Sequence, residues 1–247
     1  MAARKYASAE STGTSSTTST SDQTKVTLTF TPDANSTYAY IWSCQAGGAT
    51  NYDVRVKLKN NAGTVLCNGN HQNNDANDFI PYSGFAIETF GSSPTSQSIT
   101  LTYSSEGTIT ASIKNARIVA IKLTSADVYS ENTGTSTSSS TSVFTAATTA
   151  TFTPASAGFY AVLGYCEQNS GSNGGAGRYR VTINDVLSYN SAELVSLVTD
   201  FIPNMSVSYS TSLSGSCNIK YEFNSYGGNT VSCRNAKILA LRMDEFD

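Results

Sequence analysis

The side chains that could carry out chemistry are few and scattered in this sequence. A serine or cysteine nucleophile usually needs a histidine as its base, and the chain's one histidine is His71, in the polar stretch 68–78. Hydrolysis by paired carboxylates needs two facing acids, whereas the acids here fall in turns, on polar strand positions or at the chain ends. Neither phosphate-binding motif, GxxxxGK or GxGxxG, occurs. We therefore expect a protein that is not an enzyme, without catalytic residues or bound cofactors.

A metal site is also weakly supported. The stretch NGNHQNNDAND (68–78) places Asp75 and Asp78 among asparagines, whose oxygens could ligate calcium. The alternating acidic pattern of a calcium loop is missing, and clusters of Asn and Asp are ordinary turn formers. The five cysteines are odd in number and contain no CxxC pair, so the sequence predicts neither a disulfide framework nor a zinc site. We expect reduced thiols and no bound metal.

Polar loops and aromatic residues remain as candidates for binding. A tyrosine ring can stack on a sugar or anchor a protein interface, and several of the 14 tyrosines lie in or near expected loops, among them Tyr82, Tyr189, Tyr209 and Tyr226. The alternative is that they are strand residues that cover a sheet. The interaction candidates are Asn70, His71, Asn74, Asp75, Tyr82, Asn173, Tyr189 and Tyr226.

These candidates lie on a sequence that is written twice. The closing stretch NARIVAIKL (115–123) returns as NAKILALRM (235–243), and shorter matches precede it at a nearly constant offset. Each copy has about the length of one ordinary domain, so the chain is a tandem duplication joined near residues 124–127. The shorter matches are STGT (11–14) with NTGT (132–135), FTP (30–32) with FTP (152–154), Cys44 with Cys166, and DFIP (78–81) with DFIP (200–203).

The hydrophobic pattern predicts strands throughout. Residues 26–30 and 52–59 alternate between apolar and polar side chains, which is typical of strands with one buried face. Each closing stretch contains a run of apolar residues closed by a basic residue, which predicts a strand covered on both faces. The stretch 185–199 could be a short helix or two strands, and its equivalence to the first copy favours strands.

About eight short strands per copy, with turn residues between them, predict an all-β fold. We expect two tandem antiparallel β-sandwich domains of jelly-roll type, related by internal duplication. An immunoglobulin-like sandwich is the alternative, but the Cys–Trp–Cys pattern that would support it is missing. The expected boundaries are 1–24 for a Ser/Thr-rich N-terminal arm or edge strand, 25–124 for the first module, and 125–247 for the second module with its own Ser/Thr-rich lead-in.

Charge and hydropathy exclude several partners. The net charge is −3 and the basic residues do not cluster, so we expect no binding to nucleic acid. No apolar segment follows the basic residues near the N-terminus, and no run of 18 apolar residues occurs, so we expect no signal peptide and no membrane partner. These features predict a soluble protein that is made in a cytoplasm.

The repeated strands also carry a family resemblance. The strands Val26 to Pro32 and Asn115 to Leu123, with their second copies Thr149 to Pro154 and Asn235 to Met243, resemble virion components of tailed bacteriophages. Those components include capsid decoration proteins, head fibres and tail-associated jelly rolls. The resemblance implies a protein of the virion, without catalytic residues, whose partners are the major capsid protein or other virion proteins.

Two functions follow from that resemblance. The first is a capsid decoration or cement protein that binds the shell and stabilises it. The alternative is a tail or head-fibre module that binds host-surface glycans through the loops 68–78 and 169–177. The resemblance also implies a homo-oligomer, with a trimer as the expected state.

Overall fold

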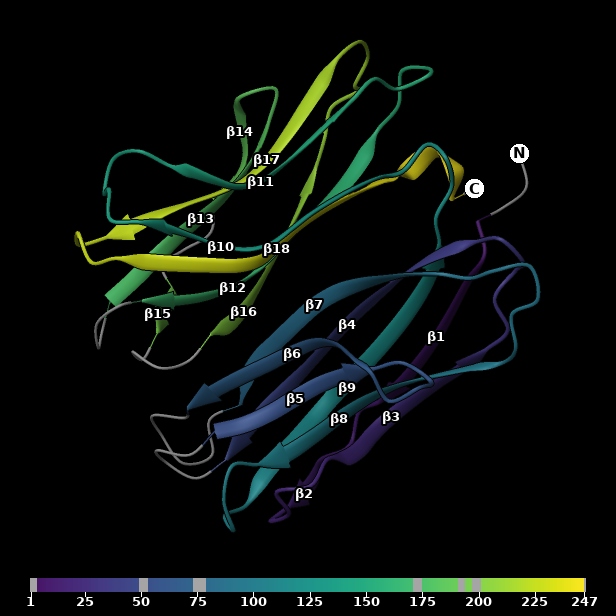
Figure 1. Ribbon diagram of the computed structural model, residues 1–247, viewed down its shortest axis with the longest axis vertical. Coiled ribbons are helices and arrows are strands. Elements are labelled where there is room, and N and C mark those ends of the chain that lie inside the picture. Colours follow the sequence, from purple (N-terminus) through teal and green to yellow (C-terminus); the bar gives the residue numbers. More distant parts are fainter. Residues whose placement is uncertain are drawn as a thin grey trace. The chain divides into compact units, whose positions relative to one another are not determined.

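The computed structural model describes residues 4–48, 53–72, 79–170, 175–190, 194–196 and 201–246 (Figure 1). The chain divides into two compact units, Arg4–Leu123 and Thr124–Asp247. The described residues form strands in both units, and a short 3-10 turn (Met243–Glu245) follows the last strand. The prediction of an all-β fold is therefore confirmed.

The first module is a sandwich of two antiparallel sheets, and most strands that follow one another in sequence lie in opposite sheets, as in a jelly roll. One sheet has the order β1 (Tyr6–Ser11), β9 (Ala111–Lys122), β4 (Thr37–Gly48), β7 (Ile80–Thr89), and β2 (Ser15–Thr17) also pairs with β9. The other has the order β3 (Gln23–Phe30), β8 (Gln97–Ser105), β5 (Asp53–Lys59), β6 (Val65–Gln72).

The second module repeats the order of the four main strands in each sheet, which confirms two tandem sandwiches. The stretch 185–199, which is ambiguous in sequence, supplies two strands and no helix among its described residues. One sheet has the order β10 (Val128–Ser138), β18 (Val231–Arg242), β12 (Tyr160–Ser170), β16 (Ile202–Tyr209). The other has the order β11 (Thr145–Phe152), β17 (Cys217–Tyr226), β13 (Gly175–Ile183), β14 (Val186–Asn190), and β15 (Leu194–Ser196) also pairs with β13.

The Ser/Thr-rich lead-in of the first module forms an edge strand. Strand β1 pairs with β9 from Tyr6 opposite Ile121 to Ser11 opposite Ala116. The compact unit accordingly begins at Arg4, so residues 4–24 belong to the first sandwich. Hydroxyl side chains suit such a strand because they can alternate between a half-buried and a solvated face.

The repeated Asn-Ala pair forms a β-bulge in each closing strand. In β9, Asn115 and Ala116 together stand opposite the single residue Cys44 of β4. In β18, the second Asn-Ala pair stands opposite Cys166 of β12 in the same way. The asparagine of each pair is left-handed, with φ of 51° and 50°, a conformation that asparagine tolerates better than most residues. The matching sequences therefore encode an irregularity as well as a strand.

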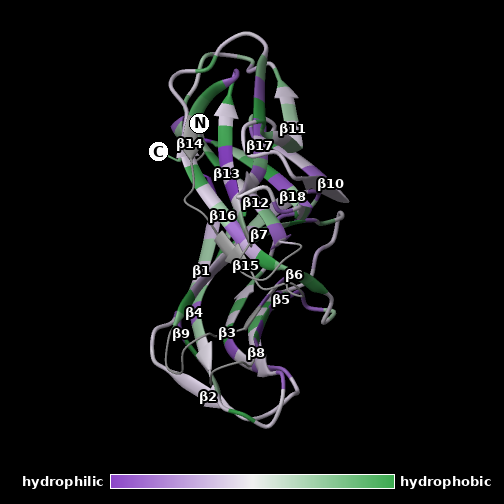
Figure 2. Ribbon diagram, turned by 90° about the vertical axis from the view of Figure 1, so that its left-hand side faces the viewer, coloured by the Kyte–Doolittle hydropathy of each residue, from purple (hydrophilic) through white to green (hydrophobic). Residues whose placement is uncertain are grey.

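The two closing strands differ in burial. In β18 the consecutive residues from Ile238 to Leu241 are all buried, as predicted for a strand covered on both faces. In β9 the prediction was wrong, because Arg117 is exposed and Val119 is only half-buried between buried neighbours. Colouring by hydropathy shows the corresponding alternation along many of the strands (Figure 2).

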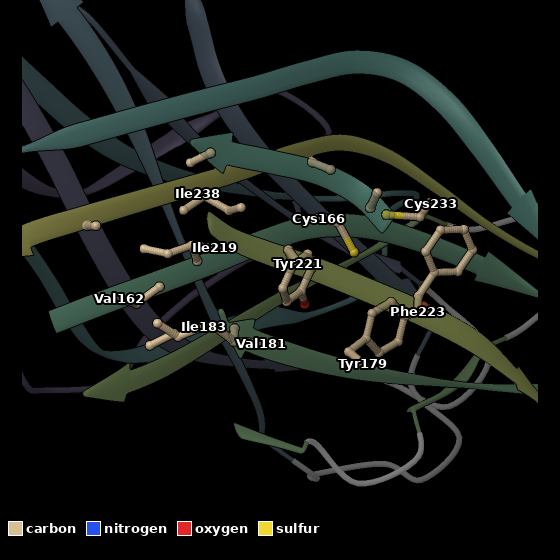
Figure 3. Close-up of a cluster of buried hydrophobic side chains, with 14 of the residues drawn as sticks. Val162, Cys166, Tyr179, Val181, Ile183, Ile219, Tyr221, Phe223, Cys233 and Ile238 are labelled. Atoms are coloured by element: carbon tan, nitrogen blue, oxygen red, sulfur yellow. The ribbon is translucent and has the colours of Figure 1, made fainter. Parts of the chain in front are cut away.

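Aromatic rings and thiols fill the core of the second module. Tyr179 is stacked on Tyr221 and Phe223, with ring centroids 6.1 and 6.4 Å away. Cys166 and Cys233 belong to the same buried cluster (Figure 3). All five cysteines of the chain are buried and outside any disulfide, in agreement with the expected reduced thiols.

Candidate functional site

A groove opens at one end of the second module, where the turn between β13 and β14 meets the loop after β16. Its volume is about 430 Å³, which falls within the range of about 300–1,000 Å³ that is usual for ligand sites. Among the described residues, no charged side chain lines it. The lining residues are Ile183, Asn184, Val186, Leu187, Tyr209, Ser210, Thr211 and Leu213.

The groove combines a buried floor with exposed apolar walls. Ile183 and Leu213 are buried, whereas Val186 and Leu187 are largely exposed and Tyr209 is 69% exposed. Large apolar side chains that gather in one exposed place mark a binding surface more often than single ones do. This groove is therefore the candidate functional site.

A tight hairpin turn positions one wall of the groove. Asn184 and Asp185 both have positive φ, 51° and 62°, which is the backbone of a two-residue turn that follows the twist of paired strands. The Asn184 amide nitrogen donates to the carbonyl oxygen of Asn218 at 2.8 Å, and the Asn218 amide donates to Asn184 Oδ1 at 2.9 Å. Lys220 forms an ion pair with Asp185 at 2.5 Å. These contacts hold the turn against β17.

Backbone hydrogen bonds position the other wall. Ser210 donates its amide to the carbonyl oxygen of Tyr160 at 2.9 Å, and the Tyr160 amide donates to Ser210 Oγ at 2.8 Å. Leu213 and Gly158 exchange both of their backbone hydrogen bonds, at 2.8 and 3.1 Å. Since both walls are tied to the sandwich, a ligand would meet a preformed groove and would lose little affinity to ordering.

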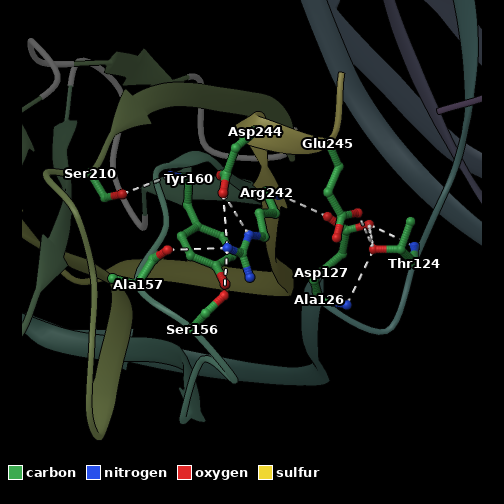
Figure 4. Close-up of polar contacts among 10 residues, drawn as sticks. All are labelled: Thr124, Ala126, Asp127, Ser156, Ala157, Tyr160, Ser210, Arg242, Asp244 and Glu245. Carbon is green, nitrogen blue, oxygen red and sulfur yellow. Dashed lines mark hydrogen bonds and ion pairs between the residues drawn. The ribbon is translucent and has the colours of Figure 1, made fainter. Parts of the chain in front are cut away.

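Arg242 fixes the loop that precedes β12, next to this wall. Its guanidinium donates to Asp244 Oδ2 at 2.9 and 3.0 Å, to Ser156 Oγ at 2.9 Å and to the Ala157 carbonyl oxygen at 3.1 Å (Figure 4). The hydrogen bond and the positive charge of Arg242 lower the pKa of Asp244. A Cβ atom at Gly158 would lie 2.8 Å from Arg242 Nε, so a larger residue there would displace the guanidinium.

A second hollow, also of about 430 Å³, lies beside the start of β10. It is lined by residues 125–129 and 152–155 and by Tyr160. The Tyr160 hydroxyl is buried without a hydrogen-bond partner among the described residues, and burial raises its pKa. Tyr160 also packs edge-on against Phe152, so its ring belongs to the buried core of the second module.

Basic side chains lie over aromatic rings in both modules. Lys114 Nζ is 3.9 Å from the ring centroid of Phe79, and the guanidinium of Arg234 is 3.7 Å from that of Phe201. The two phenylalanines are those of the repeated DFIP motif, and the two basic residues directly precede the repeated Asn-Ala pair. The duplication thus preserves a cation–π contact, whose sequence signal is the pairing of DFIP with a basic residue before Asn-Ala.

The structure places the predicted interaction residues in several different environments. The expectation for Tyr82 was wrong, because it is 1% exposed in β7. Tyr226 is exposed at the end of β17, and Arg178 lies 4.3 Å from its ring centroid. Asn70 and His71 belong to strand β6, so residues 68–72 of the expected loop 68–78 are part of a strand, and the other residues of that loop lie outside the described ranges. Similarly, in the loop expected at 169–177, residues 169–170 belong to β12 and residues 175–177 belong to β13.

The other predicted residues lie wholly or partly outside the described residues. Tyr189 lies on β14, but its side chain is not among those described, and Asn74, Asp75 and Asn173 fall outside the described ranges altogether. Of the groove residues, only Tyr209 was among the candidates from sequence, because the sequence marks the turn of the groove but not the loop that meets it. Asn184-Asp185 between apolar residues was the available signal.

Neither a metal site nor a membrane span is found in the described part of the chain. Within those ranges, no three His, Cys, Asp or Glu side chains gather closely enough to hold a metal ion. The same ranges contain no helix with the length and apolar character needed to cross a membrane.

Comparisons with known proteins give only distant similarities. No protein-family model matches the sequence, and no curated protein matches it significantly. The tandem CBM51 modules of a family 98 glycoside hydrolase from Streptococcus pneumoniae are similar over 92% of this chain and 88% of theirs, with 10% identity and a TM-score of 0.28. A structure of infectious bursal disease virus, Gt strain, is similar over 97% of this chain and 73% of its own, with 10% identity and a TM-score of 0.30.

A third similar structure is the N-terminal CBM22-1-CBM22-2 tandem domain of Xyn10C from Paenibacillus barcinonensis. It covers 96% of this chain and 93% of its own, with 7% identity and a TM-score of 0.24. The structural neighbours thus include tandem CBM modules and viral particles. At these identities and TM-scores the likeness assigns no function to the chain.

Proposed function

We propose that this protein is a non-enzymatic structural component of a tailed-bacteriophage particle, and specifically a capsid decoration or cement protein. In this function it binds the major capsid protein, or another virion protein, and stabilises the shell as a homo-oligomer, with a trimer as the expected state. The sequence resemblance of the repeated strands supports the assignment to a phage particle.

The observation that carries the proposal is an exposed apolar cluster at the C-terminal end of the second module, formed by Phe159, Met243 and Phe246. Phe159 is 55% exposed, and the other two side chains are more than a third exposed. The Met243 amide donates to the Phe159 carbonyl oxygen at 2.9 Å, and the Phe246 amide donates to the Met243 carbonyl oxygen at 3.2 Å. Exposed apolar residues whose backbones are joined in this way suit a protein interface, because burying their side chains on a neighbour releases water.

The chemistry of the rest of the molecule agrees with a passive structural part. The thiols are buried, and burial raises the pKa of Cys44 to about 12, so this sulfur is a poor nucleophile at neutral pH. Charged residues make up 13% of the chain, so a broad interface can form without burying many unpaired ions.

Expanded capsids that lack the protein provide the test. We expect the purified protein to co-sediment with them and to raise their temperature of disruption. Phe159→Asp should abolish co-sedimentation, because a carboxylate cannot be buried at the interface without a large cost in desolvation. The control is Val143→Asp, which places the same charge at an exposed residue between β10 and β11. Failure of the wild-type protein to bind the capsids would refute the proposal.

A second candidate function is a tail or head-fibre module that binds host-surface glycans. Tyr209 favours it, since an exposed tyrosine that lines an uncharged groove is a suitable surface for a sugar ring. Glycan-array binding by the wild-type protein would support this function. Binding that persists after residues 73–78 and 171–174, the parts of the two expected loops outside the described strands, are replaced by Gly-Ser linkers would exclude those residues as the site.

A further inference from the structure

We infer that the groove of the second module is a binding site for a neutral sugar ring. The inference rests on the second candidate function and adds to it the site and the class of ligand. It is independent of the shell-docking cluster around Phe159, which does not line the groove.

The lining of the groove specifies a ligand with two kinds of surface. Five lining residues are apolar or aromatic, and the other three, Asn184, Ser210 and Thr211, are polar but uncharged. A purely apolar ligand would strip water from those polar groups without replacing their hydrogen bonds. An anionic ligand would find no cation among the described residues of the lining. A sugar fits both requirements, because its ring has apolar C–H faces and an edge of hydroxyl groups.

Tyr209 provides the surface for the apolar face of the sugar. It is the last residue of β16, lines the groove and is 69% exposed. A large planar side chain of this kind loses little conformational entropy when it binds, and it buries much apolar area per contact. Leu187 and Val186 supply apolar area from the hairpin side of the groove.

The polar lining residues retain capacity for sugar hydroxyls. Ser210 Oγ accepts the Tyr160 amide, so its own hydroxyl hydrogen is available to a ligand. Asn184 uses Oδ1 to accept the Asn218 amide, while its Nδ2 has only a weak contact of 4.0 Å with Cys217 Sγ. Thr211 is exposed at the mouth of the groove. Together they can offer donors at positions fixed by the fold.

The first module differs at the equivalent turn, so we expect one site per chain. Its turn between β5 and β6 is longer, and the side chain of Asn60 is engaged within the module. Asn60 Oδ1 accepts the amides of Ala62 and Thr64 at 3.1 and 3.0 Å, and its Nδ2 donates to Glu88 at 3.0 Å. Asn60 Nδ2 is therefore already hydrogen-bonded within the module, whereas Asn184 Nδ2 has only the weak contact with Cys217 Sγ.

Titration of the full-length protein with methyl glycosides of glucose, galactose, mannose and N-acetylglucosamine tests the inference. We expect at least one of these neutral sugars to bind saturably, with one site per chain, in ligand-observed NMR and calorimetry. Tyr209→Ala should weaken binding about tenfold or more, whereas Tyr209→Phe should retain most of it because the ring face remains. The matched control is Tyr6→Ala, which removes a tyrosine that is 72% exposed in the first module.

Other outcomes would overturn the inference. One is the absence of binding by all four glycosides up to high millimolar concentration. Another is binding that Tyr209→Ala and Leu187→Arg both leave unchanged, with each variant shown to be folded by circular dichroism. A third is loss of capsid binding by Tyr209→Ala without any sugar binding by the wild type, which would make the groove a protein-docking site. Phe159→Asp separates the two functions, because it should lose capsid binding and keep the sugar.

Discussion

Asn115 and Asn235 have the same left-handed backbone conformation in the two modules, with φ of 51° and 50°. Each lies in a bulge of the closing strand, opposite a buried cysteine of the neighbouring strand. A bulge increases the local twist and shifts the pairing by one residue. The apolar side chains on both sides of it can therefore point into the core of the sandwich. The duplication has therefore kept a local distortion that both sandwiches use.

The bulge predicts a distinctive response to substitution. Asn115→Ala should lower the free energy of unfolding by about 1 kcal/mol, because an alanine Cβ disfavours the left-handed conformation. Asn115→Gly should come close to the wild-type value, although it also loses the 3.0 Å hydrogen bond to Gln45. Urea unfolding of both variants measures the difference. Equal destabilisation by Ala and Gly would show that the side-chain hydrogen bond matters and the backbone conformation does not.

Gly164 predicts an effect of overpacking. A Cβ atom at this position would lie 2.8 Å from Tyr221 Cε2 and 3.0 Å from Ser206 Oγ, inside the core of the second module. Gly164→Ala should therefore destabilise this module by about 1–3 kcal/mol. The control is Gly91→Ala, since no atom lies within 4 Å of a Cβ there. Thermal unfolding followed by circular dichroism compares them, and similar midpoints for the two variants would contradict the packing described for Tyr221.

Arg234 and Glu167 form an ion pair, and we expect their contributions to stability to be coupled. Arg234 Nε donates to Glu167 Oε2 at 2.8 Å, and the carboxylate side chain is 4% exposed while the arginine side chain is 39% exposed. Arg234→Met should cost about 2 kcal/mol, less than a fully buried pair because solvent reaches the arginine. Adding Glu167→Gln should recover much of that loss, since no buried charge then lacks a partner. A double-mutant cycle by urea unfolding measures the coupling, and additive effects would rule it out.

The buried thiol of Cys44 predicts loss of stability in alkali. Burial raises the pKa of Cys44 from 9.0 to about 12. A folded-state pKa above the unfolded value means that this contribution is complete below about pH 9 and falls as the pH rises toward 12. Between these pH values the thiol can make the free energy of unfolding fall by an amount approaching about 1.4 kcal/mol per pH unit. Unfolding midpoints measured between pH 8 and 10.5 test this loss of stability. Cys44→Ala should have a shallower slope than the wild type, and an unchanged slope would show that Cys44 titrates normally in the folded state.

The sequence by itself determined the fold class and the duplication. Alternating apolar residues specify strands locally, because side chains of a strand point to opposite faces, and the repeated motifs show that the same pattern occurs twice. Even so, sequence did not reveal why the Asn-Ala pairs recur, because a bulge depends on the residue across the strand pair. The sequence also did not reveal why the DFIP motif recurs. In the structure its phenylalanines, Phe79 and Phe201, each lie beneath a basic side chain.

Only the tertiary structure decided which side chains are accessible and which come together. Tyr82 and Tyr226 are both tyrosines near expected loops, yet one is buried in β7 and the other is exposed at the end of β17. The groove joins Val186 and Leu187 to Tyr209 from the edge strands of two different sheets. A periodic pattern records the faces of one strand, whereas accessibility and the shape of a groove depend on how separate strands pack. For that reason the candidate site could be found only in the folded chain.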